Sequence, residues 1–73
     1  MRMSFEVDGQ RLRELRVQRA LSLRALGKRS GVTFATINNL ENGNRPARLV
    51  TIRKLAEALG VEPKELMKEE NDG

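Results

Sequence analysis

Two short helix patterns joined by a glycine occupy residues 21–43, LSLRALGKRSGVTFATINNLENG. Ser22 is a preferred N-cap residue for the first pattern. Leu21 precedes it and Leu26 lies four positions into the helix, which is the spacing of a hydrophobic staple. Gly31 supplies the left-handed conformation that ends such a helix. These signals restrict the segment to a short helix followed at once by a tight turn.

The second pattern repeats the same start signal. Thr33 is the N-cap candidate, with Val32 before it and Ile37 four positions after it. Gly27, in the middle of the first helix, costs about 1 kcal/mol against Ala, so we expect the second helix to cross close to it. Two short helices, a glycine turn and a small residue at the crossing predict a helix-turn-helix, whose second helix usually enters the DNA major groove.

Further residues on both sides of this motif complete a pattern that extends over most of the chain. The residues of the whole pattern are Leu12, Leu15, Arg16, Leu21, Ser22, Leu26, Gly27, Gly31, Val32, Thr33, Ile37, Leu40, Glu41 and Gly43, followed by the segment KLAEALGVEPKEL. From about Asp8 to Met67 the chain resembles the lambda-repressor-like, Cro/Xre-type helix-turn-helix domain of bacterial and phage regulators. The resemblance implies a compact, all-α, five-helix DNA-binding domain with a central helix-turn-helix.

Three positions depart from the pattern of that family. Leu23 stands where the family most often has a phosphate-contacting Gln, and Ala25 replaces the usual Glu of the capping box. Arg48 replaces the usual Ser or Thr cap before the fourth helix. The departures affect single contacts and caps rather than the fold.

Apolar residues at helical spacing predict five helices and no strand. The predicted helices cover residues 9–20, 23–30, 34–42 and 49–59, with a short fifth helix that Pro63 opens. We divide the chain into an N-terminal arm (1–7), the helix-turn-helix domain (8–67) and a polar C-terminal tail (68–73).

The arm has three possible roles. Met3, Phe5 and Val7 alternate with polar residues as in a strand, but the sequence offers no second strand to pair with. Phe5 could fold back onto the core, the arm could form a dimer contact, or it could be mobile with Arg2 touching DNA.

Size and composition exclude several classes of protein. A chain of 73 residues is one small domain, in which a large enclosed active site is improbable. Cys and His are both absent, which excludes the usual zinc sites and most nucleophile–base pairs. We therefore expect no enzyme, no metal, no cofactor and no small-molecule ligand. With no apolar run of membrane-spanning length and no signal-peptide core, we expect a soluble cytoplasmic protein that contacts no membrane.

Basic residues gather in the middle of the chain. Residues 15–56 hold nine Lys and Arg side chains against one acid, Glu41, whereas residues 57–73 carry a net charge of −4. The positive block coincides with the helix-turn-helix and its flanks, as expected of a protein that binds a polyanion. The basic residues are Arg16, Arg19, Arg24, Lys28, Arg29, Arg45, Arg48, Arg53 and Lys54.

The outward side of the second motif helix carries the candidate base-reading residues. They are Thr33, Phe34, Ala35, Asn38 and Asn39. Asn can bridge adenine N6 and N7, while Phe and Ala can touch a thymine methyl group. Asn39 could instead be an idle exposed amide, and Phe34 could turn into the core. Asn42 fits a structural role in the turn that ends the helix.

This helix has no Lys or Arg, so it cannot make the common Arg–guanine contact, and affinity must come largely from backbone phosphates. The candidate phosphate-binding residues are Leu23 (through its N–H), Arg24, Asn44, Arg45 and Arg48. We expect Arg19, Lys28 and Arg29 to contribute to the electrostatic field more than to contacts.

Arg16 and Glu41 match two residues that form a structural ion pair in the family. The resemblance therefore implies that they tie the first helix to the third, without reading DNA. The alternative is two unrelated surface charges.

The sequence predicts a sequence-specific double-stranded DNA-binding regulator, most simply a repressor that binds a palindromic operator as a homodimer. The candidate dimer residues are Val50, Val61, Leu66 and Met67, although Leu66 could belong to the core. The rival prediction is a protein-binding module, such as an antitoxin component, with secondary DNA binding.

Overall fold

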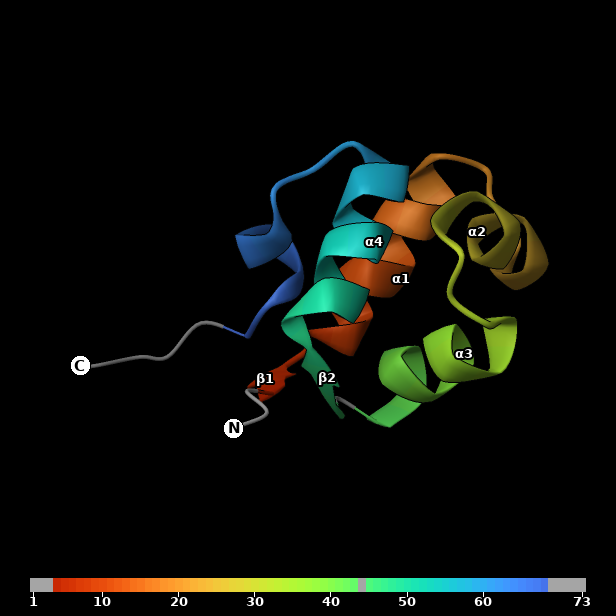
Figure 1. Cartoon of the computed structure of the whole chain (residues 1–73). Helices are drawn as coiled ribbons and strands as arrows, with labels where there is room; N and C mark the ends of the chain where they lie inside the picture. The colour runs from red at the N-terminus through yellow and green to blue at the C-terminus, as the bar shows by residue number, and fades with distance from the viewer. Residues whose placement is uncertain (1–3, 44, 69–73) are drawn as a thin grey trace.

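The helical elements follow the order that the sequence predicts, with a small sheet added (Figure 1). The computed structural model describes residues 4–43 and 45–68. Within these residues there are four α-helices, one two-stranded sheet and one 3-10 turn. The elements are β1 (Ser4–Glu6), α1 (Gly9–Gln18), α2 (Leu23–Ser30), α3 (Phe34–Gly43), β2 (Pro46–Arg48), α4 (Leu49–Leu59) and η1 (Pro63–Leu66). The predicted helical fold is confirmed, but the fifth helix is a single 3-10 turn rather than a helix of its own.

Side-chain caps begin the first three helices, and those at Ser22 and Thr33 are as predicted. Asp8, Ser22 and Thr33 each accept a hydrogen bond from the backbone N–H three residues later, at 3.1, 3.0 and 3.3 Å. Arg48, before α4, makes no such bond, as expected from its lack of a short polar side chain.

Positive backbone angles end three of the helices. Gly31 after α2 has φ 78° and Gly60 after α4 has φ 73°, both in the left-handed region that glycine tolerates. Ala20 has φ 56°, and α1 ends at Gln18, two residues before the predicted end. Ala20, which the predicted helix over residues 9–20 includes, is exposed and lies outside α1.

The prediction of no strand was wrong. β1 pairs antiparallel with β2, placing Phe5 opposite Ala47. Phe5 packs on the core, and Val7 is fully buried, with its N–H bonded to the Arg45 carbonyl oxygen at 3.2 Å. The partner strand lies some forty residues away in sequence. With only three residues it is too short to show an alternating pattern, so the sequence offers no signal for it. Arg2 and Met3 lie outside the described residues.

The core draws side chains from every helix and from both ends of the described chain. Its members are Val7, Leu12, Leu15, Leu26, Val32, Ile37, Leu40, Ile52, Leu55, Ala56, Leu59 and Leu66. Leu66 is fully buried and is therefore a core residue rather than a dimer contact. Figure 1 shows α2 and α3 together at one side of the molecule, with the sheet below α4. None of the helices in residues 4–43 and 45–68 is long and apolar enough to cross a membrane.

Candidate nucleic-acid interface

The outer face of α3 is exposed and uncharged. Ile37 and Leu40 point into the core, whereas Thr33, Phe34, Ala35, Asn38 and Asn39 are all exposed. Helical spacing thus separates the two faces as the sequence predicts. This face presents amides, a hydroxyl and apolar groups, which are the groups that contact base edges in the major groove.

Hydrogen bonds within α3 distinguish the polar side chains of this face. The Thr33 hydroxyl donates to the Thr36 hydroxyl at 2.9 Å, and Asn42 Nδ2 donates to Asn38 Oδ1 at 3.0 Å. The side chain of Asn39 makes no hydrogen bond to the residues that the structure describes. Asn39 therefore has both its amide donor and its amide acceptor free for a base.

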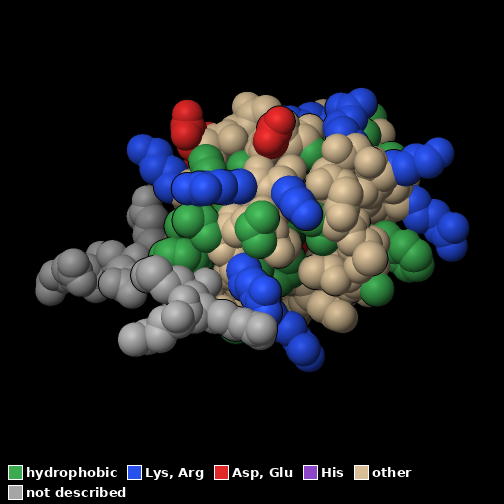
Figure 2. Space-filling view, in the orientation of Figure 1, with side chains coloured by type: hydrophobic (Ala, Val, Ile, Leu, Met, Phe, Trp, Pro, Cys, Tyr) green, Lys and Arg blue, Asp and Glu red, His purple; other side chains and the backbone are tan. Residues whose placement is uncertain are grey.

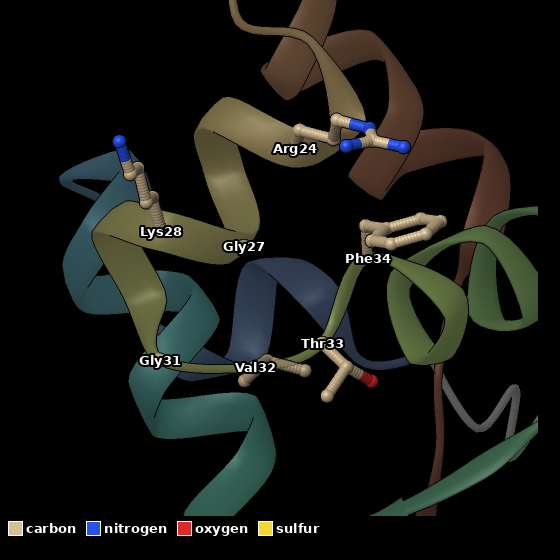
Figure 3. Close-up of a pocket in the computed structure, with 7 residues that line it drawn as sticks. All are labelled: Arg24, Gly27, Lys28, Gly31, Val32, Thr33 and Phe34. Carbon is tan, nitrogen blue, oxygen red and sulfur yellow. The ribbon is translucent and has the colours of Figure 1, made fainter.

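The side chain of Phe34 stands outside the core at the start of α3. It is 46% exposed, and the guanidinium carbon of Arg24 lies 4.9 Å from the centroid of its ring. Figure 3 shows the two side chains facing each other across the space between α2 and α3, with Lys28 pointing away. Arg24 thus contacts a residue of α3 directly, which sequence reasoning did not anticipate.

An open groove of about 570 Å³ separates α2 from α3 on this side. An added Cβ at Gly27 would lie 2.9 Å from the Val32 carbonyl oxygen, so the predicted close approach at Gly27 is confirmed. The groove is lined by Arg24, Gly27, Lys28, Gly31, Val32, Thr33 and Phe34.

The candidate phosphate contacts flank α3 at both of its ends. Leu23 is half-buried against the core beside the α2 N-terminus, so only its backbone N–H is suited to an anion. Arg45, just before β2, and Arg48, its last residue, are exposed at the other end. Asn44 lies outside the described residues. The sheet fixes the backbone of this second group, because β1 pairs with β2.

Arg16 and Glu41 form the ion pair that the family resemblance implies. Arg16 Nε lies 2.7 Å from Glu41 Oε2 and Nη2 lies 3.0 Å from Oε1, a bidentate geometry. The two side chains are only 13% and 4% exposed. The hydrogen bond with Glu41 raises the pKa of Arg16, and the partial burial that opposes it is the smaller effect. The pair therefore ties α1 to α3 from inside the molecule and is not available to DNA.

Arg19 has a structural role that the sequence analysis missed. Its Nε donates to the Leu59 carbonyl oxygen at 2.6 Å and its Nη1 donates to the Leu15 carbonyl oxygen at 3.2 Å. These carbonyls are in the last turns of α4 and α1, where the intrahelical N–H donors run out. A basic residue just after a helix was the available signal.

Apart from Arg16 and Arg19, the other seven Lys and Arg side chains of residues 15–56 are exposed. They are Arg24, Lys28, Arg29, Arg45, Arg48, Arg53 and Lys54. In Figure 2, Lys and Arg side chains project from the edge of the molecule beside α2, and the surface just below them, where α3 lies, is uncharged. Charge thus surrounds the α3 face without covering it.

Known proteins resemble this chain in both sequence and structure. A helix-turn-helix family model matches residues 12–66. The uncharacterized HTH-type transcriptional regulator RghRB of Bacillus subtilis is 47% identical over 60 residues, which are 81% of this chain and 43% of that protein. The HTH-type transcriptional repressor RghR of the same organism is 45% identical over 64 residues, 86% of this chain and 47% of that protein. This chain spans about half the length of these two relatives.

A solved structure supports the same relationship. The restriction-modification controller protein C.AhdI from Aeromonas hydrophila is 47% identical, with a TM-score of 0.75 over 81% of this chain and 89% of that one. The family model covers well over half of the chain, and the matched residues include α2, the turn and α3. The chain therefore belongs to the helix-turn-helix family.

Proposed function

We propose that this chain is a sequence-specific double-stranded DNA-binding transcription regulator that inserts α3 into the major groove. The observation that carries the proposal is the uncharged, exposed face of α3 with cations on both sides of it. The residues that read bases in this proposal are Thr33, Phe34, Ala35, Asn38 and Asn39. The names of its relatives support the regulatory role, since two of them are HTH-type transcriptional regulators.

The backbone contacts come from groups outside α3. Arg45 and Arg48 bind phosphates at its C-terminal end, and the N–H of Leu23 binds one at the start of α2. These contacts set the register of the protein on the duplex but carry no sequence information.

A two-fold complex on a palindromic operator follows from size. One ten-residue helix contacts too few base pairs to select a site in a genome, and two copies about 34 Å apart would read successive major grooves. Val50 (54% exposed) and the half-buried Val61 and Met67 are candidates for the contact between copies. Repression is the simplest outcome, because a protein bound over a promoter blocks it, and one relative is a repressor.

Selection of duplexes from a random pool tests the proposal. The protein should enrich one sequence with inverted half-sites whose centres are about one helical turn apart. Enrichment of no sequence, together with a stable complex with another protein, would contradict it and favour the rival role as a protein-binding module.

A further inference from the structure

We propose that Arg24 of α2 and Phe34 of α3 act as one unit that reads a thymine–guanine step, an inference that rests on the proposed DNA binding. The guanidinium carbon lies 4.9 Å from the ring centroid, within the range of a cation–π contact. Both side chains are exposed at the edge where α3 begins. The sequence alone assigned Arg24 to a phosphate, but the stacking directs it to the base-reading face instead.

α3 lacks the group that most commonly recognises guanine. Its sequence, FATINNLENG, contains no Lys or Arg. Bidentate donation from Arg to guanine O6 and N7 is the commonest specific contact in the major groove. Arg24 comes from the neighbouring helix, and its contact with Phe34 brings a guanidinium to the first residue of α3.

The N–H donors of Arg24 are unused, and its guanidinium lies over the Phe34 ring. Arg16 and Arg19 direct their N–H groups to protein acceptors. Arg24 makes no hydrogen bond or ion pair with the residues that the structure describes. Stacking engages the face of a guanidinium and leaves its in-plane N–H groups free. Because the ring restricts the side chain before DNA arrives, less conformational freedom is lost on binding.

Phe34 supplies the second half of the unit. Phe34 is 46% exposed beside Arg24, and it borders an open groove of about 570 Å³ with two glycines in its wall. An exposed phenyl ring suits the C5-methyl group of thymine, which projects into the major groove. Two stacked side chains reach neighbouring bases, so the methyl group and the guanine belong to one step.

Atom-specific changes in the duplex test each half of the unit. The probe is the duplex selected by the wild-type protein. Replacing the thymine with deoxyuridine should weaken wild-type binding about fourfold, as expected for one buried methyl group, and should not affect binding by Phe34→Ala. Replacing the guanine with 7-deazaguanine should weaken wild-type binding and leave Arg24→Ala unaffected.

A double-mutant cycle tests whether the two residues act together. Arg24→Ala and Phe34→Ala should each weaken binding by roughly 5- to 100-fold. The fold loss in affinity of the double variant should be smaller than the product of the two single losses by about threefold or more. The reason is that each single change already removes the contact between the two side chains. Lys28→Ala is the matched control, because Lys28 is one turn along α2, carries the same charge and points away from Phe34 (Figure 3). The fold losses in DNA affinity of Lys28→Ala and Phe34→Ala should therefore multiply in the double variant.

Multiplicative losses for Arg24→Ala and Phe34→Ala would overturn the inference, as would a selected site without a thymine–guanine step. In either case a wild-type protein that still selects a site leaves the proposed function standing. A wild-type protein that prefers no duplex overturns both. Both side chains are exposed, so the melting temperature of each variant should stay close to that of the wild type.

Discussion

At the residue scale, the arginines of this small domain have separate functions because each guanidinium contacts different groups. Arg16 is saturated by Glu41 and by the Leu21 carbonyl oxygen, which its Nη1 contacts at 2.8 Å. Its pKa is raised, so its contribution to stability is present below the unfolded pKa and is lost only as the pH rises through the folded pKa, far above neutral. Arg16 therefore adds no pH dependence to stability near neutral pH, whereas Arg45 keeps its charge available for DNA.

Glu41→Ala should lower the free energy of unfolding by about 3–5 kcal/mol, because it leaves Arg16 charged and nearly buried without its partner. Urea denaturation measures the loss. Lys68→Ala is the control, since the Lys68–Glu6 pair is more than half exposed and should contribute about 0–1 kcal/mol. Additive effects of Arg16→Ala and Glu41→Ala in a double-mutant cycle would refute the pair.

Ala20→Gly should stabilise the protein by about 0.5–1 kcal/mol. Ala20 has φ 56°, and an L side chain in this region costs roughly 1–2 kcal/mol, part of which the greater flexibility of Gly in the unfolded chain offsets. Thermal denaturation gives the comparison. A lower melting temperature would mean that Ala20 is not strained.

At the element scale, local signals were sufficient for the helices and insufficient for the contacts between them. The caps at Asp8, Ser22 and Thr33 act within three residues, so the sequence predicts where α1, α2 and α3 begin. The sheet depends on pairing between Phe5 and Ala47, which no local pattern encodes. The bonds of Arg19 to the end of α4 are equally non-local.

The same contrast holds within the candidate interface. The exposed face of α3 could be predicted because helical periodicity separates it from Ile37 and Leu40. The stacking of Arg24 on Phe34 could not, because it depends on how closely α2 and α3 approach at Gly27. The crossing of α1 over α3 at Gly9 was missed for the same reason.

Gly9→Ala should destabilise the protein by about 1–3 kcal/mol through overpacking. An added Cβ would overlap the Leu40 carbonyl oxygen and lie 2.7 Å from the Glu41 carbonyl oxygen, both of them backbone atoms. Chemical denaturation should detect the loss. Gln10→Ala, at the next and exposed position, should change stability by less than about 0.5 kcal/mol. Equal effects at positions 9 and 10 would contradict the crossing.

At the scale of the whole molecule, the proposed DNA-binding surface has two parts, a reading face that contacts bases and a border that contacts phosphates. The reading face is the outer side of α3, which carries no charge. The border includes Lys28 and Arg29 of α2 and the exposed cations in and before β2. Figure 2 shows Lys and Arg side chains beside the uncharged surface. Contacts from the reading face should therefore depend on the DNA sequence, and contacts from the border should depend on salt.

Affinity for the selected duplex should fall steeply with salt, because the exposed cations displace condensed counterions from phosphates. With three or more phosphate contacts in each copy of a two-fold complex, the slope of log K against log salt should be steeper than about −4. Fluorescence anisotropy titrations between 50 and 200 mM salt, chosen as a range in which this effect is large, provide the slope. A slope near zero would rule out the electrostatic part of the proposal.

The most direct test of the proposal compares Asn39→Ala with Arg45→Ala on the selected duplex and on random duplex. Asn39→Ala should lose about 1–3 kcal/mol on the selected site and relax the preference at one base pair of each half-site, with affinity for random DNA unchanged. Arg45→Ala should weaken both complexes alike and reduce the salt slope by about one per site. Equal losses on selected and random DNA for Asn39→Ala would contradict the claim that α3 reads the sequence.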